Sequence, residues 1–470
     1  MPVNLALKRG FVLQQLSAHR PANTAIPMGK SKLPPNVFPP LQLSDSEKQA
    51  IVNYTDELIA ETLQASENFI AHHRRLNPER WKYVKTQDQL HVYRSRRRKS
   101  SASLDPPEFL SLSEMSFDSL PSSDGASASH NKSSMSSGAK RHDSDYLTDD
   151  SILERARPER VPLIVITGKM EGTVEDAAFG ALADNEARWR LRDAHIGDHY
   201  DDQKILATIE SPTVDDPFRF LGVKWATKTL GSFLSQRDMV YVESTGLARD
   251  SNGEKVAFVL MHSYALDRVP ELSEFGVIRS RISACFILRH HSESSVEVFT
   301  RAFNDMGGDM WKDVIVSLFK DTLLSVGGLV QCAYVKKLKW QMAAREREAR
   351  EHAISLAAKS RAPTHCAGCH HSLSKFSKLV QSGSACQVCR RVFCSKCSIT
   401  KRVGVDFGND GAIMEKDMDF CGECMGLAMK LSPWSVALET LPEGTRRLTK
   451  KHSSLSTSMS ASSSGKPSSE

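Results

Sequence analysis

Eight of the ten cysteines lie between Cys366 and Cys424 and form four pairs with the spacing C-x2-C. The pairs are Cys366/Cys369, Cys386/Cys389, Cys394/Cys397 and Cys421/Cys424. Two such pairs can surround one Zn²⁺ with four thiolates at about 2.3 Å, which leaves no open position for water or substrate. Four pairs therefore predict two structural Zn²⁺ ions.

Disulfide bonds and thiol redox chemistry are the alternative uses of paired cysteines. The sequence shows no secretory signal peptide, and disulfides are rare in reducing compartments. Redox chemistry uses a single C-x2-C motif after a strand, whereas here four motifs repeat. The spacing therefore favours metal. His365, His370 and His371 flank the first pair, and with eight cysteines available we expect them to be bystanders.

The bulk composition limits the classes of function. A chain of 470 residues has room for two or three domains. Its net charge of +6 is mild for this length and does not indicate a nucleic-acid partner. No uninterrupted apolar run reaches the roughly 18–20 residues that span a bilayer. No nucleophile–base set, phosphate-binding glycine loop or open metal site is present, so we expect no enzymatic activity.

The N-terminal region carries lysine and arginine but no acidic side chain through residue 44. This composition predicts a disordered leader over residues 1–43, with a mitochondrial presequence as the alternative. Met28 is an alternative initiator to Met1. We expect a cytoplasmic protein that can lie peripherally on endomembranes.

A folded domain is predicted over residues 44–342. Ser44 and Glu47 form a capping box before a long amphipathic helix that ends before Pro78. Strands at 81–85, 90–94 and 163–170 and short helices at 174–182 and 186–192 follow. Six further strands are expected at 205–210, 218–229, 238–244, 256–264, 282–290 and 296–303. Alternation over residues 223–228 predicts that Lys224 and Lys228 face water while Val223 and Trp225 face inward.

A long helix is predicted to close this domain, with Asp309 as its N-cap and an apolar stripe from Trp311 to Tyr334. Gly327 and Gly328 lie within the stripe and should weaken the helix. A serine-rich insert over about 97–158 is expected to be disordered, as is the tail over 431–470. Residues 343–360 read as a charged helical linker.

This order of elements resembles the START lipid-transfer family, a helix-grip fold, over about residues 44–342. The phrase Gln236-Arg237-Asp238-Met239-Val240-Tyr241-Val242 looks like that family's RDFVY-type strand. The resemblance implies an α+β domain in which a bent antiparallel sheet and a long C-terminal helix enclose an apolar lipid. Gly327 and Gly328 would then be the hinge of a lid. The alternative is a sheet and helix packed solid, with the glycines serving close packing.

The cysteine block C-x2-C-x4-C-x2-C from Cys386 to Cys397, with the run Val392-Phe393-Cys394-Ser395-Lys396-Cys397-Ser398, resembles the FYVE zinc finger over about residues 361–430. The resemblance implies a small cross-brace with interleaved pairs. Cys366, Cys369, Cys394 and Cys397 would hold one zinc, and Cys386, Cys389, Cys421 and Cys424 the other.

The residues that let FYVE fingers read a phosphoinositide are missing. No WxxD box precedes Cys366, Ser382-Gly383-Ser384-Ala385 stands where the basic RRHHCRxCG stretch begins, and Asp419-Phe420-Cys421 replaces the RVC triplet. The sequence therefore does not predict headgroup-specific binding. Lys375, Lys378, Arg390 and Arg391 could still attract an anionic membrane. The alternative function is a protein-interaction scaffold, or less favourably a ubiquitin ligase, that uses the finger and binds no lipid.

Overall fold

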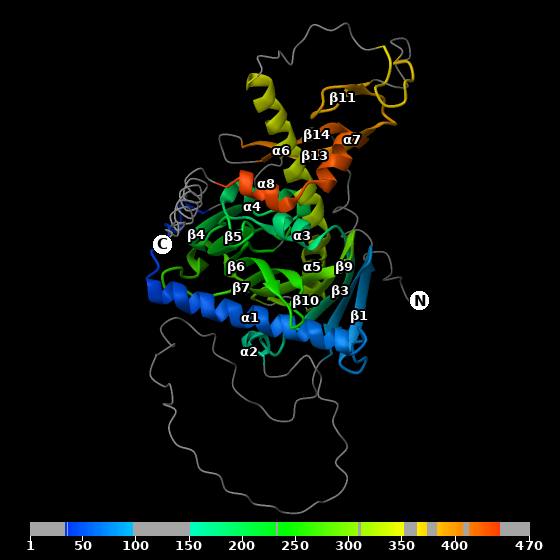
Figure 1. The fold of residues 1–470 in the computed structure, drawn as a ribbon. Helices are drawn as coiled ribbons and strands as arrows, with labels where there is room; N and C mark the ends of the chain where they lie inside the picture. Colours follow the sequence, from blue (N-terminus) through cyan, green and yellow to red (C-terminus); the bar gives the residue numbers. More distant parts are fainter. Residues whose placement is uncertain are drawn as a thin grey trace, which may run out of the picture. The chain divides into compact units, whose positions relative to one another are not determined.

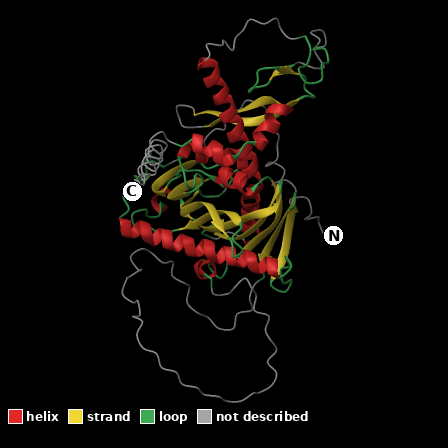
Figure 2. Cartoon of the chain, viewed as in Figure 1, coloured by secondary structure: helices red, strands yellow, loops and turns green. Residues whose placement is uncertain are grey.

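The computed structural model of the chain describes residues 33–34, 36–96, 151–231, 234–308, 312–351, 364–373, 383–407 and 413–441. These residues form two compact units. The larger unit runs from 33 to 333 and takes in 432–441, and the smaller unit runs from 334 to 431. Figure 2 shows helices and strands in both, so the chain is an α+β protein.

A large antiparallel sheet dominates the larger unit. Its strands follow the order β1-β2-β3-β10-β9-β7-β6-β5-β4, and β8 pairs in parallel with β6. In Figure 1 the β1–β3 edge turns away from the β4–β7 strands, so the sheet is bent. The strands are β1 (Trp81–Gln87), β2 (Leu90–Ser95), β3 (Ile164–Glu171), β4 (Asp202–Glu210), β5 (Phe220–Lys228), β6 (Arg237–Arg249), β7 (Lys255–Ser263), β8 (Ile278–Arg279), β9 (Arg281–Ser292) and β10 (Ser295–Asp305).

Helix α1 (Asp45–Ala71) crosses one side of the sheet, which we call the outer face (Figure 1). It begins with the predicted capping box, in which the Ser44 hydroxyl oxygen accepts from the Glu47 backbone N–H and the Glu47 carboxylate accepts from the Ser44 backbone N–H. Its Leu58 and Phe69 pack against large side chains of the outer face. These include Phe258, Leu260, Ile287, Phe299 and Phe303. The outer face is therefore a filled apolar core.

A buried polar network joins α1 to the outer face. The two ring nitrogens of His262 lie 3.1 Å from the Tyr54 hydroxyl and 2.8 Å from the Ser283 hydroxyl. Burial lowers the pKa of His262 to about 4 and raises the pKa of Tyr54 to about 12. Both rings are therefore neutral at pH 7.

This burial makes stability depend on pH. Between pH 6.5 and 4 the unfolded chain protonates His262 while the folded chain does not, so stability present above pH 6.5 is lost on acidification. We expect a loss of about 3 kcal/mol over this window. Urea unfolding of the protein and of a His262→Gln variant should show their difference shrinking as pH falls. A difference that stays constant from pH 7 to pH 4 would exclude a buried neutral imidazole.

Three predictions of disorder were wrong at their margins. Leu33 and Phe38, inside the predicted leader, are buried against the sheet. Helix α2 (Ile152–Ala156), inside the predicted insert, is capped by Ser151 and buries Leu153. Helix α8 (Pro433–Glu439), inside the predicted tail, packs on α3 (Val174–Ala181), and its Trp434 ring meets Phe218 edge-on at 5.5 Å. A few apolar residues in each segment supply enough burial to order it. The leader through 32 and the insert from 97 to 150 lie outside the described residues.

The predicted closing helix is interrupted. It consists of α5 (Lys312–Leu324), the 3₁₀ segment η3 (Ser325–Gly328) and α6 (Leu329–Glu351). The break coincides with Gly327 and Gly328, the poorest helix formers in the stripe. The proposed cap Asp309 lies outside the described residues. The predicted linker is helical through Glu351, and residues 352–360 are not described.

Among the described residues, one helical stretch, Val314–Glu351, is long and apolar enough to cross a membrane by length and composition. Lys320 and Asp321 interrupt this stretch, so it is not an uninterrupted apolar run of the kind considered above. Buried core helices pass the same test, and Phe319, Leu323 and Val330 of this stretch are buried in the protein.

The smaller unit is built from most of α6 and a finger. The finger contains the short hairpin β11 (Ser384–Ala385) and β12 (Val392–Phe393), the long hairpin β13 (Ser398–Phe407) and β14 (Ile413–Cys421), and helix α7 (Gly422–Lys430). Its apolar core is small, with Phe393, Val403 and Phe420 buried. Lys339 of α6 donates to the carbonyl oxygen of Gly404 at 2.8 Å.

Candidate ligand-binding face and metal centres

The side of the sheet opposite α1, which we call the inner face, carries small side chains in its middle. Strand register aligns Glu243, Met261, Ala284, Ala302 and Ile164 in one row across β6, β7, β9, β10 and β3. Side chains alternate between faces along a strand, so this row lies opposite the large residues of the outer face. Ala284 and Ala302 are buried.

The Met261 side chain is more exposed than expected for a residue in a central strand of the sheet. It lies on β7 in the interior of the sheet, where strands β6 and β9 flank it. Every other residue of β7 from Val256 to Ser263 is buried, whereas Met261 is only half-buried. Space on the inner face beside Met261 is therefore accessible to solvent and is not filled by protein atoms.

Helices α3 and α4 (Glu186–Ile196) cover part of the inner face together with η3 and the start of α6. Two glycines permit close backbone contacts in this cover. A Cβ on Gly180 would lie 1.9 Å from the Leu329 carbonyl oxygen, and one on Gly328 would lie 3.3 Å from the His195 carbonyl oxygen. Gly327 is less crowded, with only the Leu90 side chain within 4 Å. Gly180 and Gly328 therefore serve close packing, whereas Gly327 does not, and the use of Gly327 and Gly328 as a hinge remains a prediction.

A buried ion cluster fastens this cover to the sheet. Arg192 of α4 donates to both carboxylate oxygens of Glu243, at 2.8 and 3.0 Å, and Lys224 of β5 donates to Glu243 at 2.7 Å. The same cations cap the C-terminal end of α3, because Arg192 donates to the Ala181 carbonyl and Lys224 to the Ala183 carbonyl. Positive charge is favourable at a helix C-terminus.

The charges in this cluster compensate one another. Burial alone would raise the pKa of Glu243, but Arg192 and Lys224 outweigh it and hold that pKa below its usual range. Burial lowers the pKa of Lys224 to about 8 against the attraction of Glu243. The prediction that Lys224 faces water was wrong, because helices cover the inner face as well as the outer one. Lys228, predicted to be exposed, is partly buried and pairs with Asp198.

Several buried polar atoms of the inner face have no hydrogen-bond partner among the described residues. They are the Tyr241 hydroxyl, the Thr300 hydroxyl, the Asn304 side-chain oxygen and the Nε1 of Trp189 on α4. Tyr241 stands directly opposite Lys224 in the sheet, and Thr300 stands opposite Phe286 and Ile166. Sequence reasoning missed all four, because nothing in a single sequence shows that a buried group lacks a partner.

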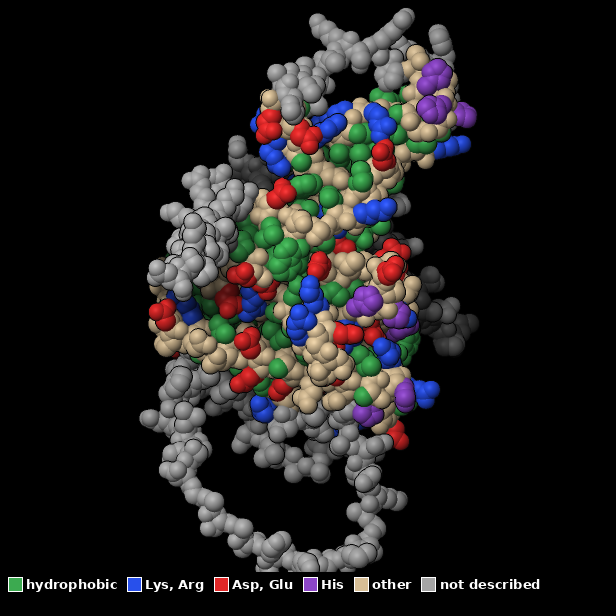
Figure 3. Space-filling model, in the orientation of Figure 1, with side chains coloured by type: hydrophobic (Ala, Val, Ile, Leu, Met, Phe, Trp, Pro, Cys, Tyr) green, Lys and Arg blue, Asp and Glu red, His purple; other side chains and the backbone are tan. Residues whose placement is uncertain are grey.

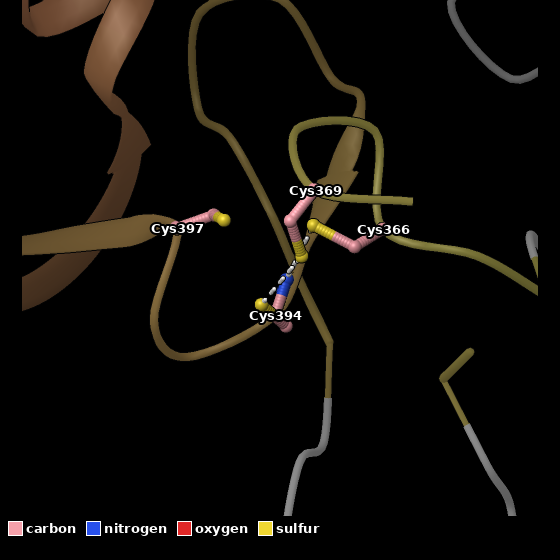
Figure 4. Close-up of side chains that lie close together, drawn as sticks. All are labelled: Cys366, Cys369, Cys394 and Cys397. Atoms are coloured by element: carbon pink, nitrogen blue, oxygen red, sulfur yellow. Dashed lines mark hydrogen bonds between the residues drawn. The ribbon is translucent and has the colours of Figure 1, made fainter. Parts of the chain in front are cut away.

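The eight finger cysteines form two groups of four. Cys366, Cys369, Cys394 and Cys397 form one, and Cys386, Cys389, Cys421 and Cys424 form the other, with the sulfurs of each group within 4.8 Å of one another. The grouping is the interleaved one that the resemblance implies. Figure 4 shows the four sulfurs of the first group pointing toward one space. Each group could hold a metal ion.

The sulfur spacing fits a tetrahedral metal. The sulfurs of Cys369 and Cys394 are 3.6 Å apart, and those of Cys389 and Cys421 are 3.9 Å apart. Four metal–sulfur bonds of about 2.3 Å in a tetrahedron place sulfurs about 3.8 Å apart. The backbone N–H groups of Cys369 and Cys394 donate to Cys366 and lower the pKa of its thiol to about 6, whereas hydrogen bonding with the thiols of Cys369 and Cys394 raises the pKa of Cys397 to about 12.

Two of the four basic residues proposed to contact a membrane form ion pairs with acidic side chains of the protein. Arg391 pairs with Glu423, and Arg390 lies 3.8 Å from Glu346. Lys375 and Lys378 lie outside the described residues. Acidic and basic side chains are mixed on the face drawn in Figure 3. Membrane contact by these residues remains a prediction.

No protein-family model and no curated protein matches the chain. Several solved structures are similar to it in fold. Human StAR-related lipid transfer protein 5 shares 13% identity over 59% of this chain and 96% of its own, with a TM-score of 0.32. A STAR-related lipid transfer protein from Xanthomonas axonopodis shares 13% identity over 54% and 99%, with a TM-score of 0.30. Truncated norcoclaurine synthase from Thalictrum flavum shares 11% identity over 36% and 94%, with a TM-score of 0.20. At these scores the likenesses carry no inference about ligand or activity.

Proposed function

We propose that the larger unit is a START-like domain that holds an apolar lipid between the inner face of its sheet and the covering helices. The half-buried Met261 carries this proposal, because it marks unfilled space beneath a covered face. Neighbouring inner-face residues such as Val259 and Phe286 are buried and apolar, and they supply apolar walls for such a ligand.

The finger is proposed to bind two structural zinc ions and to belong with FYVE-related fingers. Four thiolates without a histidine or carboxylate favour Zn²⁺ over harder cations. The small core of the finger gives the metals a structural role, since so few apolar residues cannot order it alone. Zinc–thiolate sites suit a reducing compartment, which favours a cytoplasmic location. The protein would then act by binding and not by catalysis.

Filling the inner face tests the lipid proposal. The full chain would be incubated with phosphatidylcholine vesicles that contain a fluorescent acyl-chain lipid, and protein-bound lipid would be measured after separation. We expect the protein to take up lipid and a Met261→Trp variant, whose larger side chain extends into the accessible space, to lose most of this uptake. The variant's free energy of unfolding should change by less than about 1 kcal/mol, because the added atoms enter space that protein does not fill.

Ala65 of α1 provides the matched control, because it is buried in the filled core of the outer face. Ala65→Leu should cost about 1–3 kcal/mol through overpacking and leave lipid uptake unchanged. The proposal fails if the unsubstituted protein takes up no lipid. It also fails if Met261→Trp destabilises as much as Ala65→Leu while uptake persists, because the inner face would then be packed solid.

A further inference from the structure

The chain segments on the two sides of the finger contact the same two helices of the inner-face cover. Before the finger, α6 begins so close to α3 that a Cβ on Gly180 would lie 1.9 Å from the Leu329 carbonyl oxygen, and η3 contacts α4. After the finger, α8 packs on α3, and the carbonyl oxygen of Thr440 at its C-terminus accepts from Arg188 of α4 at 2.9 Å (Figure 1). The finger is therefore inserted in the chain between two segments that contact the same cover.

Helix α8 is too short to be stable without its docking contacts. It has seven residues, and isolated helices of this length are marginal in water. Val436 and Ala437 are buried, the Trp434 ring contacts Phe218, and the Lys255 ammonium lies 5.8 Å from the centroid of the Trp434 ring. The docking of so few side chains depends strongly on the length of the chain that tethers α8, because tether length sets its effective concentration.

The folded finger makes this tether short. Lys337 of α6 donates to the carbonyl oxygen of Met429 near the end of α7 at 3.5 Å, across 92 residues of sequence. Ser432, the N-cap of α8, follows Met429 by three residues. The other end of α7 belongs to the second cysteine group, because Cys421 caps this helix and its sulfur accepts from the Cys424 N–H at 3.4 Å. Unfolding of the finger would lengthen the tether between α6 and α8 from a few residues to the whole finger, and would lower the effective concentration of α8 about a hundredfold.

We propose that the finger, folded around its metal ions, keeps α8 docked on α3 and α4, and that loss of the metal releases α8 and speeds the exchange of lipid at the inner face. The inference rests on the proposed lipid-holding function and on the proposed zinc sites. The few buried apolar residues of the finger cannot keep it folded without metal. The finger then acts on the cover of its own chain, and zinc supply controls how fast the cover opens.

Hydrogen exchange of the full chain, before and after a chelator removes the zinc, tests the docking of α8. Backbone amides of α8 should exchange up to about a hundredfold faster without zinc, whereas those of α1 on the outer face should not change. Added Zn²⁺ should restore slow exchange in α8. This measurement needs no lipid, so its result does not depend on the lipid-holding function. Unchanged exchange in α8 after removal of the zinc would overturn the inference.

Trp434→Ala tests whether release of α8 is sufficient when the finger is intact. The variant should retain two zinc ions, because Trp434 belongs to neither cysteine group. Its rate of uptake of a fluorescent acyl-chain lipid from phosphatidylcholine vesicles should rise at least about threefold, because the cover opens more often. The zinc-free unsubstituted protein should show a rise of similar size. Ser435 is exposed on the same helix, so Ser435→Ala should leave both the exchange of α8 and the uptake rate unchanged.

The outcomes separate the inference from the function on which it rests. Faster hydrogen exchange in α8 with an unchanged rate of lipid uptake would overturn control of the cover by the finger and leave the lipid-holding function intact. Lipid uptake by neither the unsubstituted protein nor Trp434→Ala would overturn the lipid-holding function, even if removal of zinc released α8.

Discussion

Replacing Cys394 by serine should reduce the metal content of the protein from two ions to one and loosen the finger around the lost site. Cys394 is buried, its sulfur lies 3.6 Å from that of Cys369, and its backbone N–H donates to Cys366. Structural metal sites of this kind contribute on the order of 10 kcal/mol, which is coupled to folding. The small apolar core of the finger cannot replace that contribution. Metal analysis of the purified variant and limited proteolysis of the finger measure the two effects.

Cys285 is the matched control, because it is buried in the filled outer-face core and belongs to neither cysteine group. Cys285→Ser should lower stability by placing a hydroxyl in that core, but two metal ions per chain should remain. If Cys394→Ser also retained two ions, the four-sulfur assignment would be wrong. Loss of both ions would instead indicate that the two sites fold as one unit.

Replacing Glu243 by glutamine should lower the free energy of unfolding by about 3–5 kcal/mol, because it leaves Arg192 and Lys224 buried without their counter-charge. Lys224 gives this loss a pH dependence. Its pKa of about 8 lies below the unfolded value of 10.5, so between these values the unfolded chain binds more protons and stability rises with pH. Without Glu243, the Lys224 ammonium of the folded chain should lose its proton at a lower pH. The difference in free energy of unfolding between the unsubstituted protein and Glu243→Gln should therefore be smaller at pH 9 than at pH 7, as measured by urea unfolding.

The exposed pair of Arg345 and Glu348, 2.8 Å apart on α6, provides a control of the same chemistry without burial. Glu348→Gln should change the free energy of unfolding by no more than about 0.5 kcal/mol. A Glu243→Gln variant that behaved like this control would show that the cluster is accessible to water. The cover formed by α3 and α4 would then not be fastened as described.

The sequence was most informative where local chemistry decides the structure. The Ser44 and Glu47 capping box, the antiparallel strands and the presence of two four-cysteine sites follow from short-range patterns or from spacing. The interleaved grouping of the cysteine pairs came from the resemblance to FYVE fingers. The break in the closing helix at Gly327 and Gly328 follows from the same kind of rule, although the sequence predicted a weak helix and not a 3₁₀ segment. These features need no knowledge of what packs against them.

The candidate ligand site could not be predicted in the same way, because it depends on what covers each face of the sheet. Lys224 occupies a polar position in an alternating strand, and only the contact with α4 makes that position buried. The same holds for Ala284. Nothing in the sequence distinguishes this alanine from others, and only the strand register places it beside Met261.

Native mass spectrometry of the full chain, purified without added lipid or metal, tests the central claim most directly. The intact mass should exceed the mass of the polypeptide by two zinc ions and one lipid, and denaturation should release the lipid. A mass that corresponds to the polypeptide with metal but without lipid, unchanged after incubation with lipid vesicles, would contradict the claim that the covered face of the sheet holds a lipid.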